Sequence, residues 1–284
     1  HGRIQPFLID DCRNITIRGV TVEYERSFHT EFRIISNTDG ELRLKKLPEF
    51  PCRVENGYLI PYGRHWENRT LNIGDMWMQV FDTVTGDGVG FIVGVIGENI
   101  QLHETPPCEV HRFKVREDNG DVILIGKAPE NWNSRMTLVL AHEWRDVSSA
   151  FICRSRDISI VNYRILNGAG MGILGMYTKN ITIDHLILRR DKQSHGVIAN
   201  VADAVHLIAC FGKIAIKDSI IEGMVDDALN IHSNYMEIKK CEGNVLRLFR
   251  HPMSHCVNAY FKLIGEGDII SIHEGQTMAV RGNF

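Results

Sequence analysis

The sequence predicts an all-β protein in which a parallel β-helix is interrupted by inserted antiparallel β-barrel-like modules. Short runs rich in Ile, Val and Thr recur along the chain at intervals of 23 and 33 residues. Between the first run and the others, this repeat is replaced by Asp-Gly and Asn-Gly turns between β-rich runs. Helical periodicity is almost absent, so these two patterns define the architecture.

The repeated unit is a short strand with apolar residues at alternate positions. It occurs four times, at 14–17, 157–160, 180–183 and 213–216. Ile158 and Ile181 are 23 residues apart, whereas Ile181 and Ile214 are 33 apart, which fits one 23-residue turn with a ten-residue loop near 189–196. Such a repeat is typical of a parallel β-helix. The alternative is an ordinary β-sandwich whose strands resemble one another by chance.

Hairpin turns mark the inserted module. They are Asp39-Gly40, Asn56-Gly57 and Asn119-Gly120, and both residues of such a pair readily adopt positive φ. Four segments are therefore predicted: β-helix coils at 1–26, an inserted barrel-like module at 27–147, coils that carry the active site at 148–240, and a second, truncated β-rich insert at 241–284.

Composition narrows the class of function. With 284 residues, 44% of them hydrophobic, the chain can build a large core. Lys and Arg number 32 against 35 Asp and Glu, so nothing favours nucleic acid or an anionic membrane as the partner. No apolar run approaches the ~20 residues of a membrane-spanning helix. The chain begins with His1 and shows no signal peptide, so we expect a piece of a longer protein.

The seven cysteines lie far apart and form no Cys-x-x-Cys pair. This spacing argues against a zinc ribbon or a redox motif. We expect most of them to be small buried hydrophobic residues beside strands.

Three aspartates are the candidate catalytic residues. The segments 203–208 and 227–232 align without gaps at an offset of 24 residues, so Asp203 and Asp227 should lie on neighbouring strands, about 4.8 Å apart. Asp226 directly precedes Asp227. Like charges this close disfavour joint ionisation, an arrangement that suits groups dividing acid and base roles. Turn capping and a calcium site are the alternatives.

Strand alternation adds three candidate substrate-binding residues. His206, Asn230 and His232 should point outward, while the apolar residues between them face the interior. A buried carboxylate is rare, so the corner before each strand should break the alternation and turn Asp203 and Asp227 outward as well. These polar side chains would then share one face.

The runs 201–206 and 220–232 resemble glycoside hydrolase family 110, whose members are exo-acting α-1,3-galactosidases. The resemblance is specific over about 150–240 and only architectural elsewhere. It implies a right-handed parallel β-helix interrupted by β-barrel inserts. It also implies a terminal α-galactosyl oligosaccharide or glycoconjugate as substrate, no metal, no cofactor, and a longer bacterial parent that is secreted or periplasmic.

By the same resemblance, the essential aspartates of the family correspond to Asp203, Asp226 and Asp227, and hydrolysis proceeds with inversion. We expect Asp203 and Asp227 jointly to hold the attacking water as base, and Asp226 to be the acid. Two alternatives stay open: a pectinase-like polygalacturonase, whose Gly-His-Gly and Arg-x-Lys signatures are missing after Asp227, and a non-catalytic carbohydrate-binding β-helix.

A sugar site usually adds an aromatic platform to its polar groups. Four tryptophans, all in or bordering the inserted module, are candidates: Trp66, Trp77, Trp132 and Trp144.

Overall fold

The computed structural model describes residues 4–68, 77–97, 109–142, 147–191, 193–233, 236–249, 267, 269–275, 277 and 279–283. Every regular element in these ranges is a strand, which confirms the all-β prediction. The described residues include no helix with the length and hydropathy required to cross a bilayer. The chain divides into two compact units, His1–Ser233 and Asn234–Phe284.

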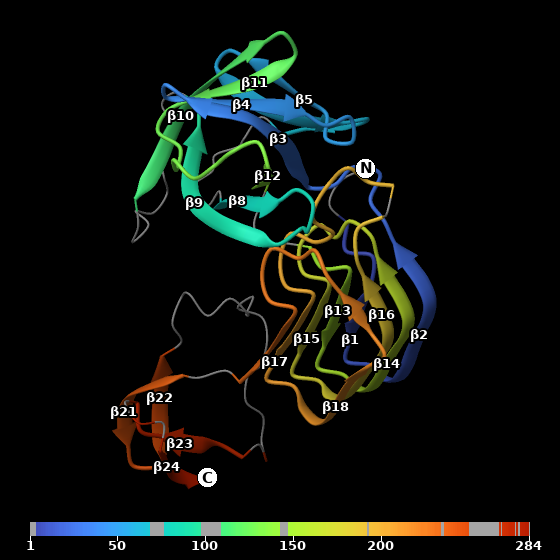
Figure 1. Ribbon diagram of the computed structural model, residues 1–284. Coiled ribbons are helices and arrows are strands. Elements are labelled where there is room, and N and C mark those ends of the chain that lie inside the picture. Colours follow the sequence, from blue (N-terminus) through green and yellow to red (C-terminus); the bar gives the residue numbers. More distant parts are fainter. Residues whose placement is uncertain are drawn as a thin grey trace. The chain divides into compact units, whose positions relative to one another are not determined.

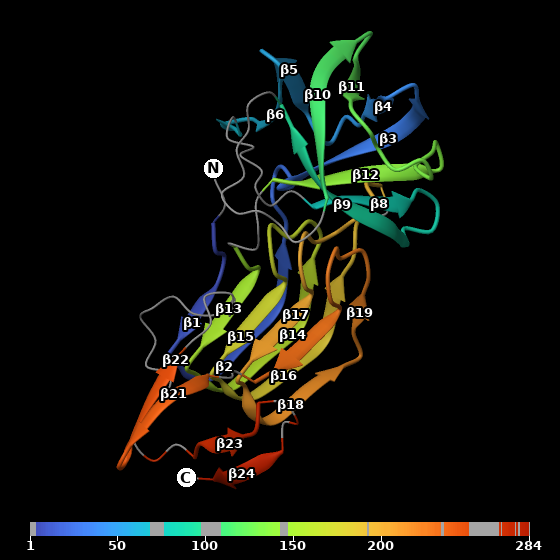
Figure 2. The ribbon, with the colours of Figure 1, turned by 90° about the vertical axis from the view of Figure 1, so that its left-hand side faces the viewer.

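Two parallel sheets run through the first unit (Figures 1 and 2). The first sheet contains β1 (Leu8–Asp10), β13 (Ala150–Cys153), β15 (Ile173–Met176), β17 (Val205–Ile208) and β20 (Leu229–His232). The second contains β2 (Arg13–Val22), β14 (Arg156–Ile165), β16 (Lys179–Leu188) and β18 (Phe211–Lys217), with β19 (Ile220–Ile221) also beside β16. The chain alternates between the sheets, so each turn of chain adds a strand to both.

The register of the second sheet follows the sequence repeat. Ile15 lies opposite Ile158, Ile158 opposite Ile181, and Ile181 opposite Ile214. The predicted stacking of these isoleucines is therefore confirmed. Ile158 and Ile181 are almost fully buried in the core between the sheets. The extra residues between Ile181 and Ile214 fall after β16, in the region where the polar loop was expected.

The residue before each of the first three isoleucines explains the Asn or Asp at the start of the motif. Asn14, Asp157 and Asn180 have φ values of 56°, 57° and 59°. This left-handed conformation is strained for most side chains, but Asn and Asp tolerate it. Ahead of Ile214, Gly212 takes a φ of 76° instead, and the register of β18 against β16 shifts there.

An inserted β-barrel separates the first turn of chain from the rest. Seven strands close it: β3 (His29–Thr38), β4 (Glu41–Lys46), β8 (Trp77–Asp82), β9 (Gly88–Ile96), β10 (Val110–Asp118), β11 (Asp121–Ile125) and β12 (Met136–Ala141). All pairs are antiparallel except β9 with β10. A small antiparallel sheet follows β4 in sequence: β5 (Cys52–Glu55), β6 (Tyr58–Gly63) and β7 (Trp66–Glu67).

The three turns that marked this module are hairpins, as predicted. Asp39-Gly40 joins β3 to β4, Asn56-Gly57 joins β5 to β6, and Asn119-Gly120 joins β10 to β11. Both residues of each pair have positive φ. This backbone geometry matches the twist of the two flanking strands.

A buried carboxylate fixes the barrel to the parallel sheets. Glu31, on β3 and fully buried, accepts hydrogen bonds from the backbone N–H of Val197 at 2.7 Å and of Ile198 at 3.2 Å. His29 lies 3.1 Å from the same carboxylate. Apolar side chains from both parts pack next to it: Phe81, Val139, Val197, Ile198, Val201 and Val225. The loop between β16 and β17 is thereby held against the barrel.

The glycines of 168–172 bring neighbouring turns of chain into close contact. A Cβ atom on Gly168 would lie 1.7 Å from Oδ1 of Asn200, and one on Gly172 would lie 2.3 Å from the Ala204 carbonyl. Gly170 is as tightly placed against the Val147 carbonyl, at 2.1 Å. These glycines therefore serve close backbone packing between neighbouring turns.

The second unit contains two antiparallel pairs, β21 (Glu237–Glu242) with β22 (Val245–Phe249) and β23 (Ser271–His273) with β24 (Val280–Asn283). The predicted boundary at residue 240 falls inside β21, whereas the compact unit starts at residue 234.

Among the described cysteines, Cys52 and Cys153 are buried and Cys241 is exposed, and all five are free thiols. Burial raises the pKa of Cys52 and of Cys153 to about 11, so both remain uncharged at neutral pH. Cys108 and Cys256 lie outside the described residues.

Candidate active site

Where the chain leaves the second sheet and returns to the first, the connecting segments of three successive turns lie side by side. Isolated parallel bridges join Gly168 to Asn200 and Asn200 to Met224. The buried side-chain amide of Asn200 donates to the carbonyl oxygens of Ala202 at 2.9 Å and Asp203 at 3.0 Å. These bonds fix the backbone directly ahead of β17, where the first predicted aspartate lies.

Asp203 and Asp227 occupy equivalent positions on successive turns, as the 24-residue offset predicted. His206 lies opposite Asn230 in the register of β17 with β20, and the Ala204 N–H donates to the Asp227 carbonyl at 2.9 Å. Their environments differ, because Asp203 is fully buried and Asp227 is exposed.

The expectation that the corner turns Asp203 outward is wrong. Its Oδ2 lies 2.5 Å from Nδ1 of His206, a pairing that offsets the loss of water around a buried carboxylate. His206 is itself only 3% exposed, so the expectation that it points into solvent is also wrong. β17 is buried at all four positions, and its alternation therefore does not separate an outer face from an inner one.

The second nitrogen of His206 contacts His232. The Nε2 atoms of the two rings are 2.9 Å apart, and the rings meet edge to face. Nδ1 of His232 donates to the Ser233 carbonyl at 2.8 Å. Unlike His206, His232 is exposed, as predicted.

Asn230 is partly buried and supports Asp227. Its Nδ2 donates to Oδ2 of Asp227 at 2.9 Å, so the amide orients that carboxylate. The apolar neighbours Leu229 and Ile231 lie opposite the core residues Val205 and Leu207, which fits the predicted inward orientation, yet they are 49% and 51% exposed. Among the described residues, β20 is the last strand of its sheet, so these two side chains have no neighbour from a following strand of that sheet there.

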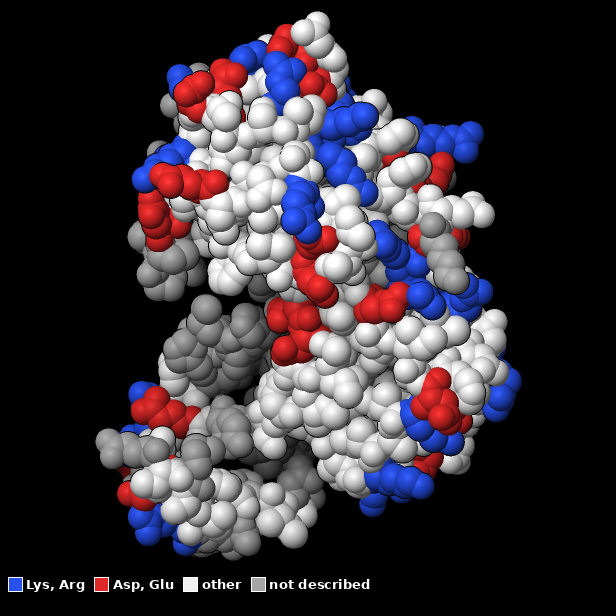
Figure 3. Space-filling view, in the orientation of Figure 1, with Lys and Arg blue, Asp and Glu red and all other residues white. Residues whose placement is uncertain are grey.

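Asp226 lies in a cavity of about 730 Å³ between the barrel and the parallel sheets. The cavity is lined by residues 79–81, 85–91, 190, 197 and 221–226. This volume falls within the range of small-molecule sites. Acidic side chains gather at the junction of the two parts on the face seen in Figure 3. The barrel thus contributes half of the walls around Asp226.

Several cavity residues were missed by the sequence analysis. Gln79, on β8, donates from Nε2 to the carbonyl of Val225, the residue before Asp226, at 3.1 Å. Phe91, on β9, is 58% exposed and is an aromatic surface within the cavity wall. Arg190 adds a positive charge and donates to the Gly196 carbonyl. Barrel strands follow no coil offset, so no spacing connected them with Asp226; only the Gly-Asp-Gly at 86–88 marked a turn here.

The predicted tryptophan platform does not line this cavity. Trp132 is buried in the barrel core. Trp66 borders a second cavity of about 270 Å³, together with Tyr24, Arg26 and Phe28. The side chain of Trp77 and all of Trp144 lie outside the described residues.

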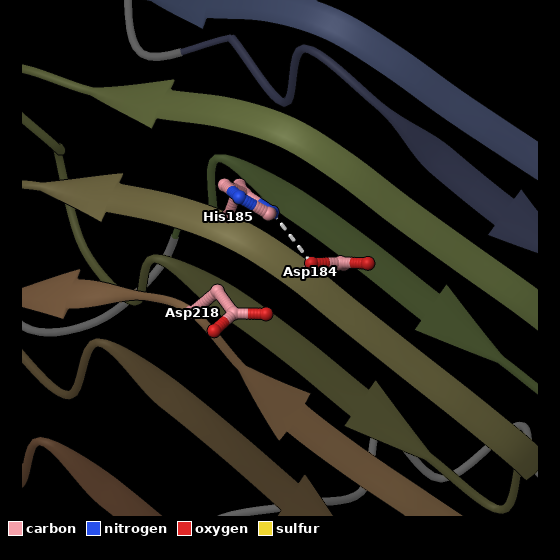
Figure 4. A group of neighbouring side chains, drawn as sticks. All are labelled: Asp184, His185 and Asp218. Atoms are coloured by element: carbon pink, nitrogen blue, oxygen red, sulfur yellow. Dashed lines mark hydrogen bonds and ion pairs between the residues drawn. The ribbon is translucent and has the colours of Figure 1, made fainter.

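A separate acidic cluster occurs on β16 and the corner after β18. Ligand-capable atoms of Asp184, His185 and Asp218 lie within 4.8 Å of one another (Figure 4), and the three predicted aspartates form no such group in the described chain. The Lys217 ammonium, 2.9 Å from Asp184, holds the pKa of that carboxyl below its usual range, with His185 contributing. Charge within the cluster is thus already compensated by neighbouring side chains.

Comparison with known proteins adds an independent finding. No family model matches the chain. It is 27% identical over 245 residues to α-1,3-galactosidase B of Bacteroides thetaiotaomicron, covering 84% of this chain and 37% of that protein. It is 24% identical over 301 residues to α-1,3-galactosidase B of Phocaeicola vulgatus, covering 99% and 44%. It is 25% identical over 289 residues to α-1,3-galactosidase A of Bacteroides fragilis, covering 98% and 43%.

The resemblance to α-1,3-galactosidases stated from the sequence is therefore confirmed by curated relatives. The chain spans less than half the length of those relatives.

Proposed function

We propose that this chain carries the active site of a glycoside hydrolase that removes terminal α-1,3-linked galactose from glycans. The observation that carries the proposal is the position of Asp226 in the wall of a cavity, directly before Asp227, in a chain similar to α-1,3-galactosidases. We propose further that the two parallel sheets are coils of a right-handed parallel β-helix, and that the full-length parent is secreted or periplasmic.

The chemistry would be a single displacement with inversion. Such hydrolysis needs one carboxylic acid to protonate the leaving oxygen and one carboxylate to activate water, across roughly 6.5–9.5 Å. Asp226 is assigned as the acid because it lines the cavity. Asp203 and Asp227, one strand apart, form the base side, with the exposed Asp227 oriented by Asn230. No metal or cofactor takes part in this scheme.

Sugar recognition would combine both parts of the molecule. Two of the predicted substrate ligands are accessible: Asn230, which binds the Asp227 carboxylate and is partly exposed, and His232, which is exposed. The barrel adds Phe91 and Gln79 along the cavity wall. His206, also predicted to bind substrate, is buried against Asp203, and we assign it an indirect role.

The experiment is a turnover assay of the full-length parent with a panel of α-galactosyl oligosaccharides, monitored by NMR. The first-formed sugar should be β-galactose. Asp226→Asn should lower kcat by ~10²–10⁴-fold, and substrates with good leaving groups should recover part of this loss because they need less protonation. Asp203→Asn and Asp227→Asn should show no such recovery. Asp218→Asn, an exposed carboxylate outside the cavity, is the matched control and should retain full activity.

Other outcomes separate the alternatives. Cleavage of polygalacturonate without any reaction on α-galactosides would favour the pectinase-like reading. Galactoside binding that survives all three aspartate substitutions, with no turnover by the unaltered protein, would favour a non-catalytic carbohydrate-binding module. First-formed α-galactose would show double displacement and overturn the assigned roles.

A further inference from the structure

A chain of polar contacts leads from the buried Asp203 to the surface. Oδ2 of Asp203 lies 2.5 Å from Nδ1 of His206, and Nε2 of His206 lies 2.9 Å from Nε2 of His232. Exposure rises along this path, from 0% at Asp203 and 3% at His206 to an exposed His232. The two histidines therefore connect an interior carboxylate with solvent.

The hydrogen positions on His232 follow from its partner. The Ser233 carbonyl oxygen can only accept, so Nδ1 of His232, 2.8 Å away, carries a hydrogen. A neutral His232 then presents a lone pair at Nε2. Two lone pairs at 2.9 Å would repel, and His206 must therefore donate from its own Nε2.

The other nitrogen of His206 needs a hydrogen as well. Its Nδ1 faces Oδ2 of Asp203 at 2.5 Å, where a bare lone pair would repel the carboxylate. The contact has the distance of an ion pair but not the alignment of a hydrogen bond, so attraction between opposite charges accounts for it. With hydrogen on both ring nitrogens, His206 would be an imidazolium that faces an ionised Asp203.

We propose that His206 and His232 share one proton that keeps Asp203 ionised and that exchanges with solvent at His232. In the transfer, the N–H bond at Nε2 of His206 breaks, its electron pair stays on that nitrogen, and a new N–H bond forms at Nε2 of His232. The positive charge moves from the buried ring to the exposed ring, and the total charge is unchanged. Nδ1–H of His206 faces Asp203 in both forms.

The surroundings of the pair favour retention of this proton. β15, on one side of β17, places Leu174 beside His206 and contains no titratable side chain. β20, on the other side, places Asn230 beside His206, and Asn230 binds the carboxylate of Asp227. Among the described neighbours on these strands, the titratable groups are thus Asp203 and Asp227, both of which stabilise a nearby positive charge when ionised.

The inference rests on the proposed function, in which Asp203 belongs to the base side. A protonated Asp203 could not support activation of water, so a histidine pair that keeps it ionised preserves the base. His206 is then a positioning residue that acts through Asp203, and His232 is the group through which the compensating charge reaches solvent.

The first test needs no substrate. Ring-¹⁵N-labelled histidine in the full chain reports by NMR which ring nitrogens carry hydrogen, and His206→Gln and His232→Gln assign the two rings. Near neutral pH we expect Nδ1 of His206 to be protonated and one further proton to be shared between the two Nε2 atoms. Neutral rings with a bare Nδ1 on His206 would overturn the inference, whether or not the protein is a galactosidase.

The second test uses chemical rescue in the full-length parent with an α-1,3-galactosyl substrate. His232→Gly should lower kcat by ~10²-fold with little change in KM, and added imidazole should restore at least tenfold, because the site is exposed. His206→Gln should lower kcat similarly without rescue, because that site is buried. His185→Gly, which removes a 57% exposed histidine on β16, is the control and should respond to neither treatment.

A rise in KM with kcat unchanged in His232→Gly would make His232 a sugar ligand alone and would overturn the relay. If the parent proves inactive on every α-galactoside, the NMR measurement still decides whether the shared proton exists.

Discussion

The barrel and the parallel sheets place their side chains in different ways. In the parallel sheets, a residue's neighbour on the next strand is a fixed number of residues away, such as the 24 that separate His206 from Asn230. In the barrel, neighbours depend on hairpin and crossover lengths, and β12 lies between β3 and β8 although a hundred residues separate β3 from β12. The cavity at Asp226 is lined by residues of both parts, and only the residues from the parallel-sheet part can be related to one another by sequence spacing.

The largest effect is expected when the contact between the barrel and the parallel sheets is removed. Glu31→Ala deletes a buried carboxylate that accepts the N–H groups of Val197 and Ile198. Because these donors and His29 lose their buried partner, we expect a loss of about 3–5 kcal/mol in the free energy of unfolding, measured by urea denaturation.

The matched control is Glu49→Ala, which removes an exposed carboxylate that accepts the His195 N–H at 3.0 Å on the same loop. We expect a loss of about 0–1 kcal/mol there. Equal losses for the two variants would show that burial of Glu31 is not what matters.

Close packing between successive turns gives the second prediction. Gly168→Ala would bring a methyl group onto the side-chain oxygen of Asn200, so we expect a loss of about 1–3 kcal/mol in unfolding free energy. The double variant Gly168→Ala/Asn200→Ala should lose less unfolding free energy than the sum of the two single variants, because the side-chain oxygen that collides with the new methyl group has been removed. Gly90→Ala, on barrel strand β9 with open space at its Cβ, should change stability by about 0.5 kcal/mol or less. Additive losses in the double variant would contradict this account.

The barrel's contribution to the site gives a smaller effect. Gln79→Leu removes the hydrogen bond to the Val225 carbonyl, which we expect to cost about 1 kcal/mol and to lower kcat on an α-galactoside about fivefold. The reason is that Val225 precedes Asp226 in the cavity wall. Thr83→Val, which loses a 2.8 Å contact to Thr137 beyond the cavity, should leave kcat unchanged. A kcat that is unaffected in Gln79→Leu would confine the barrel to a structural role.

The smallest effect concerns the outer surface of the parallel sheets. Lys217 holds the pKa of Asp184 below its usual range, so this pair stabilises the fold above about pH 4 and stops doing so as the pH falls through the lowered pKa. Asp184→Asn should therefore flatten the pH dependence of unfolding in acid and change little at pH 7. Lys217→Gln should flatten the same range, since it removes the partner. An unchanged acid slope in both variants would show that the pair contributes nothing.

The sequence was informative wherever one repeat could be laid on another. The stacking of Ile158, Ile181 and Ile214 and the equivalence of Asp203 and Asp227 followed from offsets alone. Burial did not follow, because alternation distinguishes faces only when one face is open to solvent, and β17 is buried on both. This is why His206 and Asp203 were expected outside and are found inside.

The barrel residues that line the cavity could not be predicted from the sequence, for a different reason. Gln79 and Phe91 sit on strands whose position against the parallel sheets is set by tertiary contacts, among them those of Glu31 and the apolar cluster around Val197. No local pattern encodes such a contact. The hairpin turns, by contrast, were predictable, because Asp-Gly and Asn-Gly pairs favour the positive φ angles of a tight turn wherever they occur.

The two ends of the inserted barrel lie side by side, and this has a consequence for the order in which the chain folds. β1 pairs with β13, and β2 with β14, across 143 residues, a closure that is entropically costly and slow for an unfolded chain. His29 pairs with Ala141, and the His142 N–H donates to the Phe28 carbonyl at 3.0 Å, so a closed barrel already brings the two ends of the insertion together. A barrel that folds first would shorten the effective loop to a few residues, and the parallel sheets could then grow outward from that point, one turn at a time.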